Sequence, residues 1–346
     1  MFEEYVTVRN AVESHTMGTD LLDMSLADIW SEYRDNPHRT RRHFAVWQDG
    51  AIIGRGIVTL RPFQSETGSH LMADILPEHR RKGVGSALYE VVERVALEAG
   101  APVLKVNVPH VATAGGARVA SPTGFGDLWA DDDGVRFLIA RGYALEQINR
   151  ISLLDTAGLA ERMRPLREAA AQAAGADYRV VSWTGPTPER WTRDLAELRT
   201  RMSTDAPSAG LVMTVDEWDA DRVREHDARV AESGRAILTS AAEHVPSGTL
   251  VAFSELILSD GKPLATQEDT LVLRDHRGHR LGMLVKIAAA DLLLERAPGR
   301  EAIVTWNAEE NRPMLDVNEA MGFRAIGYEG GWQKRVLSTD SRNEGE

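Results

Sequence analysis

Hydrophobic residues recur along this chain in two kinds of segment, which predict strands and helices in alternation. Short runs rich in β-branched residues, such as 103–108 (VLKVNV) and 302–306 (AIVTW), have the composition of buried strands. Longer stretches, such as 86–100 (SALYEVVERVALEAG) and 283–299 (MLVKIAAADLLLERAPG), are strongly helical and end at glycine, as helices commonly do. Strands that alternate with helices indicate a protein of the α/β class.

The segments follow the same order in the two halves of the chain. Residues 76–85 read LPEHRRKGVG and residues 273–282 read LRDHRGHRLG, so that leucine, histidine, arginine and glycine coincide in register. In each half a helix, a strand and a second helix follow, and the second helix ends before a Gly-Tyr or Gly-Phe pair (142–143 and 322–323). The sequence therefore predicts two tandem copies of one arrangement.

A stretch rich in Ala, Arg and Glu separates the two copies. Residues 156–177 predict a linker helix between a first domain at 1–155 and a second domain at 178–340. The second domain opens with a strand at 178–183, whereas the first begins inside a helix (EYVTVRNAVES) with no strand ahead of it. We therefore expect the sheet of the first domain to be one strand shorter, or to be completed by a strand from elsewhere in the chain.

Length, charge and composition narrow the classes of function. A chain of 346 residues is long enough for two domains with cores of their own. The 40 Lys and Arg against 52 Asp and Glu give a net charge of -12, which makes nucleic acid an unfavourable partner and mildly favours a cationic small molecule. The chain has no cysteine, so disulfides, thiolate nucleophiles and cysteine-based zinc sites are excluded.

The amino-terminal residues and the apolar runs bear on location. The first residues carry acids and lack the order of a signal peptide, and no apolar run approaches the ~20 residues of a membrane helix. We therefore expect a cytoplasmic protein with no membrane partner. The sequence does not determine the oligomeric state, and a homodimer is one of the states that it allows.

The Arg- and Gly-containing loops are the centre of the chemical argument. A strand that leads through glycines into a helix points its backbone N–H groups outward, and the helix dipole adds positive potential, which suits a pyrophosphate. In the first half, Arg80 and Lys82 add counter-charge. A P-loop would need GxxxxGK[ST], and a dinucleotide fold would need GxGxxG with a later acid; the sequence has neither.

The loops resemble the acyl-CoA loop of the GCN5-related N-acetyltransferase (GNAT) family, whose pattern is Gln/Arg-x-x-Gly-x-Gly/Ala. Residues 80–85 (RRKGVG) match it, and the preceding ADILPEH is similar to the family's Leu-x-Val-x-Pro strand. Residues 277–282 (RGHRLG) depart from it at Arg280, where the family has glycine. Residues 305–323 (TWNAEENRPMLDVNEAMGF) resemble the family's Asn-containing turn before Gly-Phe. With two copies, the chain resembles the mycothiol synthases and related double-domain acetyltransferases of actinobacteria.

This resemblance implies two acyl-CoA N-acyltransferase domains with a mixed α/β sheet, and acetyl-CoA as co-substrate without a metal. The strand before each loop then separates from its neighbour, and pantetheine lies in the gap. The residues implied to hold the co-substrate lie at the end of this strand, along the loop and, in the second half, at the Asn-containing turn: Ile75, Leu76, Arg80, Arg81, Lys82, Gly83, Val84, Gly85, Ser86, Val272, Leu273, Arg277, Gly278, His279, Arg280, Leu281, Gly282, Asn307 and Asn311.

Acyl transfer to an amine needs a group that takes the proton of the amine. Glu268 lies four residues before Val272, a place from which members of the family often present a base, and Asp269 follows it. Strand alternation predicts that the two carboxylates lie on opposite faces, so that only one reaches the cleft. The first half offers only His70 and Asp74 on its strand. A salt bridge or strand-edge solubility is the alternative role for Glu268.

The departing thiolate of CoA raises a second question. Family members frequently protonate it from a tyrosine four residues before the final glycine, but Leu138 and Asn318 stand at these positions. Because a free thiol has a pKa of roughly 8.5, the thiolate is a tolerable leaving group without a dedicated acid. Tyr328 is a candidate substitute, with packing as its alternative role.

The sequence thus favours an enzyme, an acetyl-CoA-dependent N-acetyltransferase that acts on a small amine by direct attack in a ternary complex. We place catalysis in the second half. The alternative is a scaffold or sensor, in which one or both domains bind acyl-CoA without turnover. A protein-lysine acetyltransferase would need an open peptide groove. The sequence identifies neither the amine nor the acyl group.

Overall fold

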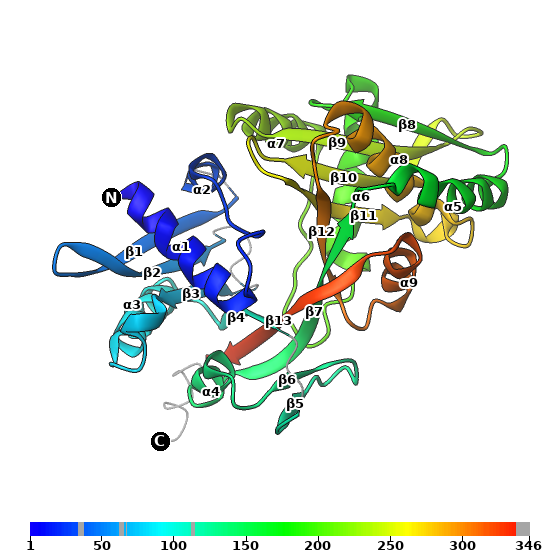
Figure 1. Ribbon diagram of the computed structural model, residues 1–346. Coiled ribbons are helices and arrows are strands. Elements are labelled where there is room, and N and C mark those ends of the chain that lie inside the picture. Colours follow the sequence, from blue (N-terminus) through cyan, green and yellow to red (C-terminus); the bar gives the residue numbers. More distant parts are fainter. Residues whose placement is uncertain (34–37, 62–65, 67, 112–114, 337–346) are drawn as a thin grey trace, which may run out of the picture.

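One continuous sheet runs through both halves of the protein (Figure 1). The computed structural model describes residues 1–33, 38–61, 66, 68–111 and 115–336, without the side chains of 31–33, so the domain end expected at residue 340 lies outside the described residues. The strands of the sheet lie in the order β1-β2-β3-β4-β13-β7-β12-β11-β10-β9-β8. Parallel and antiparallel neighbours both occur, which confirms the mixed α/β class.

The elements of the first half follow each other in this order: α1 (Phe2–Met17), α2 (Leu26–Tyr33), β1 (Thr40–Gln48), β2 (Ala51–Leu60), β3 (Ser69–Ile75), α3 (Val84–Glu98), β4 (Val103–His110), β5 (Arg118–Ala120), β6 (Asp127–Trp129), α4 (Asp133–Ile139) and β7 (Ala144–Asp155). Strands β5 and β6 form a separate hairpin.

Helix α5 (Leu159–Ala174) connects the halves and packs against α8. The elements of the second half are β8 (Tyr178–Thr184), α6 (Thr192–Asp205), α7 (Ala220–Glu232), β9 (Ala236–His244), β10 (Thr249–Leu258), β11 (Leu264–Val272), α8 (Leu281–Arg296), β12 (Ala302–Ala308), α9 (Arg312–Met321) and β13 (Arg324–Arg335). Within the described residues, the first half contributes one strand fewer to the large sheet than the second.

The two halves exchange their last strands. Strand β7 ends the first half, yet it pairs antiparallel with β12 of the second; β13 ends the second half, yet it pairs antiparallel with β4 of the first. The two exchanged strands also pair with each other at the centre of the sheet. Each half therefore completes its sheet with a strand of the other, as in a domain swap within one chain.

Helices pack on both faces of the first-half sheet. Helix α3 approaches β2 closely through Val92, because Gly56 has no side chain; a Cβ there would lie 2.8 Å from the Val92 Cγ1 atom. Helix α1 lies on the opposite face, where the Tyr5 hydroxyl donates a hydrogen bond to the Gly56 carbonyl at 3.4 Å. Its carboxyl-terminal end and the residues that follow reach toward the second half (Figure 1).

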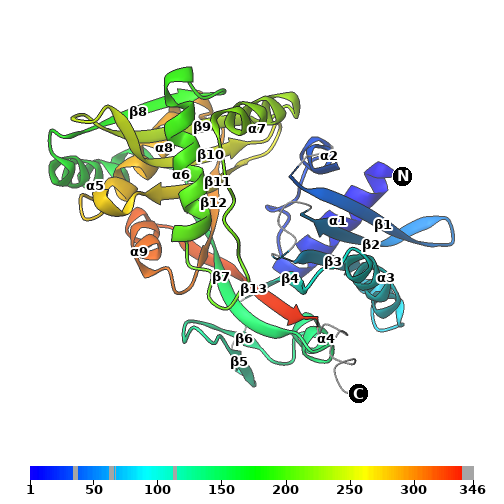
Figure 2. The same ribbon diagram turned by 180° about the vertical axis from the view of Figure 1, so that it is seen from behind.

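The connection between α6 and α7 also joins the halves (Figure 2). Side chains of three strands hold its backbone. Gln147 of β7 donates to the Pro207 carbonyl at 3.0 Å, and the buried Lys105 of β4 donates to the Val212 carbonyl. Gln333 of β13 accepts from the Val212 N–H at 2.8 Å. Among the described ranges, no helix has both the length and the apolar character needed to cross a membrane.

Candidate active site

Strands β11 and β12 are parallel neighbours only at their beginning. Their paired residues run from Leu264↔Ala302 to Thr266↔Val304, and beyond these the strands separate. A cavity of about 520 Å³ lies there, which we call the β11–β12 cleft. Its lining includes Glu268, Asp269, Lys286, Trp306, Asn307 and Asn311 from the second half, and Arg9, Glu13, Leu22 and Asp23 from the first.

A bulge in β11 lies where two neighbouring acidic residues line this cleft. Between its flanking pairs to β10, β11 has two residues, Glu268 and Asp269, opposite the single Glu255. A bulge of this kind interrupts the alternation of side chains along a strand. Both residues line the cleft, whereas unbroken alternation predicts that only one of the two carboxylates reaches it.

The cleft changes the acidity of Glu268. Glu268 is exposed in the cleft, where the crowded lining partly desolvates its carboxylate. This desolvation, with the nearby negative charge of Asp269, raises the pKa of Glu268 to about 7. A carboxylate with such a pKa is a far stronger base at neutral pH than an ordinary glutamate.

Neighbouring acids have fixed partners, whereas Glu268 has none. Arg199 of α6 pairs with the buried Glu255 at 2.6 Å and lies 3.9 Å from the Asp269 carboxylate. Within the described part of the chain, Glu268 makes no hydrogen bond or ion pair. The salt bridge considered as its alternative role therefore has no partner among the residues that the structure describes, although Arg235 and Arg199 act on Glu268 at longer range.

The two Arg/Gly loops have the same backbone shape, built from different residues. Their second and fourth positions are left-handed in both halves. In the first half these are Arg81 (φ 60°) and Gly83 (φ 83°), and in the second they are Gly278 (φ 89°) and Arg280 (φ 55°). The departure from the family pattern at Arg280 is thus matched by a glycine two residues earlier, and the loop keeps its shape.

Each loop is anchored to its strand in the same way. The Arg80 Nε donates to the Ile75 carbonyl at 3.0 Å, and the Arg277 Nε donates to the Val272 carbonyl at 3.2 Å. Leu76 and Leu273 precede a short 3-10 turn in both halves, and the loops then open α3 and α8. The predicted residues Ile75, Leu76, Val272 and Leu273 thus lie beside the loops, as expected from the repeat.

The remaining predicted loop residues lie in or beside these turns. Arg277 also pairs with the buried Asp205 of α6, at 2.9 Å, which ties the second loop to that helix. The His279 ring lies 5.1 Å from the Tyr178 ring. In the first half, Ser86 accepts from Arg141 at 2.7 Å. The other members, Lys82, Val84, Gly85, Leu281 and Gly282, form the ends of the loops and the first turns of the helices.

The first half has the separating strands but not the bulge. β3 and β4 pair only at Ser69↔Leu104 and His70↔Lys105. β3 pairs with β2 in unbroken register, so no extra residue turns a carboxylate outward. The one acid there, Asp74, accepts from the Arg55 Nε at 2.8 Å, and burial lowers the pKa of His70 to about 3.

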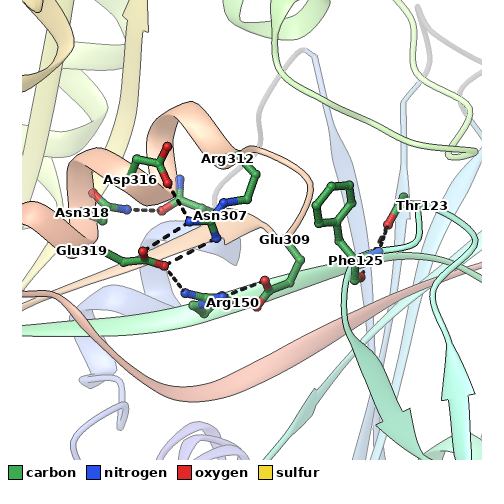
Figure 3. A network of polar contacts seen from close by, with 9 residues as sticks. All are labelled: Thr123, Phe125, Arg150, Asn307, Glu309, Arg312, Asp316, Asn318 and Glu319. Carbon is green, nitrogen blue, oxygen red and sulfur yellow. Dashed lines mark hydrogen bonds and ion pairs between the residues drawn. The ribbon is translucent and has the colours of Figure 1, made fainter.

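A polar network fixes the turn between β12 and α9 (Figure 3). The buried Asn318 donates from its amide Nδ2 to the Asn307 Oδ1 at 2.7 Å. Arg150 of the exchanged strand β7 pairs with Glu309 and Glu319, each at 2.7 Å. Strand β7 of the first half thereby holds the turn that brings Asn307, and Asn311 after it, into the cleft.

Tyr328 lies elsewhere. It sits on β13 opposite His110 of β4 and packs against the hydrophobic core of the first half. It is not among the residues that line the β11–β12 cleft. The structure therefore does not bring it together with Glu268, and we withdraw it as a candidate acid for this cleft.

Sequence reasoning missed two groups of cleft residues. Arg9, Glu13 and Asp23 come from the first half, and nothing in their spacing points to a site in the other half. Lys286 carried a signal, because it is a lysine inside the apolar helical run MLVKIAAADLLL. In the described ranges, no group of three or more His, Asp or Glu side chains is arranged to hold a metal ion.

Comparisons with known proteins agree with this geometry. Residues 10–114 match the model of the acetyltransferase (GNAT) family. Among solved structures, a tandem GNAT protein from the clavulanic acid biosynthesis pathway has a TM-score of 0.76 at 23% identity, over 98% of this chain and 96% of its own. The chain has the tandem GNAT fold. The predicted resemblance to the GNAT family is thereby confirmed, and the closer likeness to mycothiol synthases stays a prediction.

Two further structures have the same fold. A GCN5-related N-acetyltransferase from Sphaerobacter thermophilus has a TM-score of 0.63 at 12% identity, over 97% of this chain and 92% of its own. A GCN5-related glucosamine N-acetyltransferase region of a fungal multi-domain GH3 β-N-acetylglucosaminidase has a TM-score of 0.60 at 15% identity, over 96% of this chain and 37% of that protein. No curated protein matches the chain in sequence.

Proposed function

We propose that this tandem GNAT protein is an acetyl-CoA-dependent N-acetyltransferase whose second half transfers the acetyl group to a small amine. The observation that carries the proposal is the unpartnered Glu268, which lies at a bulge, lines a cleft between separating strands and is close in sequence to an anion-binding loop. The first half has the loop and the separating strands, but its acid is engaged by Arg55.

The loop and the cleft give the two substrates separate places. The left-handed residues of 277–282 point backbone N–H groups outward at the start of α8, where the helix dipole favours the phosphates of CoA. The pantetheine arm would follow the gap between β11 and β12, whose edge residues offer backbone hydrogen bonds past Thr266. Asn307 and Asn311 would contact it from the second strand.

Glu268 has the chemistry of a general base for this reaction. An ammonium has no lone pair, so the acceptor must lose a proton before or during attack on the thioester carbonyl. With its pKa near 7, Glu268 is ionised to a large extent at neutral pH and still basic enough to take that proton. Since the chain has no cysteine, we propose direct attack by the amine.

The cleft supports a small acceptor that binds through polar contacts. Its lining holds five acidic and four basic residues: Glu13, Asp23, Asp28, Glu268 and Asp269, with Arg9, Arg235, Lys262 and Lys286. Glu13 lies 4.0 Å from Arg9, whereas Glu268 and Asp269 are neighbours on β11 and give that wall of the cleft a negative charge suited to an amine. The volume of about 520 Å³ suits a small molecule.

The test measures free thiol released from acetyl-CoA against a panel of small mono- and diamines. Glu268→Gln should lower kcat by ~10²–10⁴, as for the loss of a general base, and change acetyl-CoA affinity in calorimetry only little. His70→Gln in the first half is the matched control and should keep full activity. Loss of activity in the control variant alone would move catalysis to the first half.

The same experiment separates the enzyme from the scaffold or sensor. Tight binding of acetyl-CoA to the wild-type protein, without thiol release for any amine of the panel, would favour the non-catalytic alternative. Release of thiol that depends on both the amine and Glu268 would support the transferase.

A further inference from the structure

Lys286 is a buried lysine without an anionic partner. It lies in the second turn of α8, is 1% exposed and lines the β11–β12 cleft. Its ammonium lies 5.3 Å from the centre of the Phe323 ring, and within the described residues it makes no ion pair or hydrogen bond. A buried charge that is unpaired costs several kcal/mol, so a lysine at this place needs an explanation other than stability.

The first half has a residue with a packing role at the position that corresponds to Lys286. In the register of the repeat, Lys286 corresponds to Tyr89 and Phe323 to Tyr143. The Tyr89 hydroxyl donates to the Tyr143 hydroxyl at 2.8 Å, so the polar atoms of that pair satisfy each other. Lys286 and Phe323 leave the ammonium free to act on a group inside the cleft.

Burial determines the acidity of Lys286. Burial alone lowers its pKa to about 7, and no neighbouring charge contributes. The carboxylates that share the cleft, Glu268 and Asp269 on β11 and Glu13, Asp23 and Asp28 from the first half, form no ion pair with Lys286. An ammonium of this kind gives up its proton readily near neutral pH.

We propose that Lys286 donates the proton that the departing sulfur of CoA takes up. This inference rests on the proposed function, in which pantetheine follows the gap that Lys286 reaches from α8. The position of Asn318, where an acid was expected from the resemblance, holds a neutral amide bonded to Asn307, so another donor is needed for a fast exit of the thiol.

The proton balance closes with two residues. The amine nitrogen forms the new C–N bond, and Glu268 takes one of its protons. The C–S bond breaks with its electron pair on sulfur, and Lys286 gives one proton to that sulfur and becomes a neutral amine. Transfer of a proton from Glu268 to Lys286 through water in the cleft restores both groups. The products are an amide, a free thiol and, because the acceptor enters as an ammonium, one proton released to the solvent.

The first test needs no acceptor, because it measures the thiol pKa of bound CoA by the ultraviolet absorbance of the thiolate. The variants are Lys286→Met, which removes the charge, and Lys286→Arg, which keeps it. In Lys286→Arg, the thiolate-to-thiol ratio should be about tenfold higher than in Lys286→Met at the same pH, because a nearby cation favours the thiolate. The wild type should show this rise at and below about pH 7, where Lys286 keeps its proton, and lose it at higher pH. CoA bound to the first half contributes the same thiolate absorbance in the wild type and in both variants. Its signal therefore cancels when their absorbances are subtracted.

The second test separates charge from proton donation. Arginine stays protonated across the whole working pH range, so Lys286→Arg should stabilise the thiolate but lower kcat by ~10² or more. Lys334→Met is the matched control, because Lys334 pairs with Glu93 at 2.7 Å and lies outside the cleft lining; its bound CoA should titrate like the wild type. Methionine at 286 replaces a buried charge by an apolar chain, so this variant should melt no lower than the wild type.

The outcomes distinguish this inference from the proposed function. If the wild type acetylates an amine, and Lys286→Met binds CoA with an unchanged thiol pKa, the role of Lys286 is overturned and the transferase stands. Full turnover in Lys286→Arg would also overturn it. If the second half binds no CoA, or Glu268→Gln keeps full activity, the proposed function itself fails.

Discussion

Arg55 and Asp74 face each other across β2 and β3, with the guanidinium Nε 2.8 Å from the carboxylate Oδ2. Arg55 is almost fully buried, so the pair is a structural contact of the first half. Asp74→Ala leaves this guanidinium buried without its partner. We expect it to lower the stability of the protein by about 3–5 kcal/mol in chemical unfolding, whereas the double substitution Arg55→Met with Asp74→Leu should recover most of the loss. Equal stability of the single variant and the wild type would contradict this.

The pH dependence of the reaction should reflect the ionisation of Glu268. Because a base acts only when deprotonated, and the pKa of Glu268 is raised to about 7, kcat/KM should fall as the pH drops below about 7. The negative charge of Asp269 contributes to that raised pKa, so Asp269→Asn should move the fall in rate to lower pH. The measurement is kcat/KM across the neutral range with one amine for all variants. A profile that Asp269→Asn leaves unmoved would argue against Glu268 as the titrating base.

The conformation of the second loop should depend on Gly278 because of its left-handed backbone and not because of limited space. Gly278 has φ 89°, and a Cβ there would meet no atom within 4 Å, so a side chain would cost conformational strain without a clash. We expect Gly278→Ala to lower stability by about 1–2 kcal/mol and to weaken acetyl-CoA binding. Gly299→Ala is the matched control, because Gly299 has equally open surroundings and no positive φ. Identical melting temperatures and affinities of the two variants would refute the argument.

The exchanged strands predict that the halves depend on each other. Residues 1–155 alone would lack β13, and the rest of the chain alone would lack β7. We expect neither fragment to unfold cooperatively when expressed separately, and the two to recover a folded complex when expressed together. A protease site introduced at the exposed Ala157 and Gly158 should give a nicked protein whose fragments stay together in size-exclusion chromatography. Two stable, separate fragments would show that the exchange is dispensable.

Local signals in the sequence predict most of the elements and the second loop, whereas pairing between distant segments decides the rest. The repeat of Arg, Gly and a following helix identifies the loops, because this pattern is short and continuous. The exchange of β7 and β13 leaves no local trace, since either strand would satisfy the same alternation beside any partner. The bulge at Glu268 is equally invisible, because it arises from the register with β10.

The site was therefore predictable in part. Glu268 follows from its distance to the loop, but the entry of Asp269 into the cleft depends on the bulge. Tyr328 has the right chemistry for an acid, and only the path of β13 takes it to the first-half core. Arg280 departs from the glycine of the family's loop pattern. Its φ of 55° nevertheless provides the left-handed turn that Gly83 provides in the first loop.

Reciprocal strand exchange also bears on the ancestry of the molecule. A one-domain ancestor with this arrangement would lack a central strand unless two copies paired, so the exchange fits a gene fusion of two subunits of an obligate dimer. After fusion, selection for chemistry can relax in one copy while selection for its strand persists. If the second half is the catalyst, as proposed, the first half with its Arg55–Asp74 pair would be kept for its architecture, since β7 pairs directly with Asn307 of the other copy's cleft.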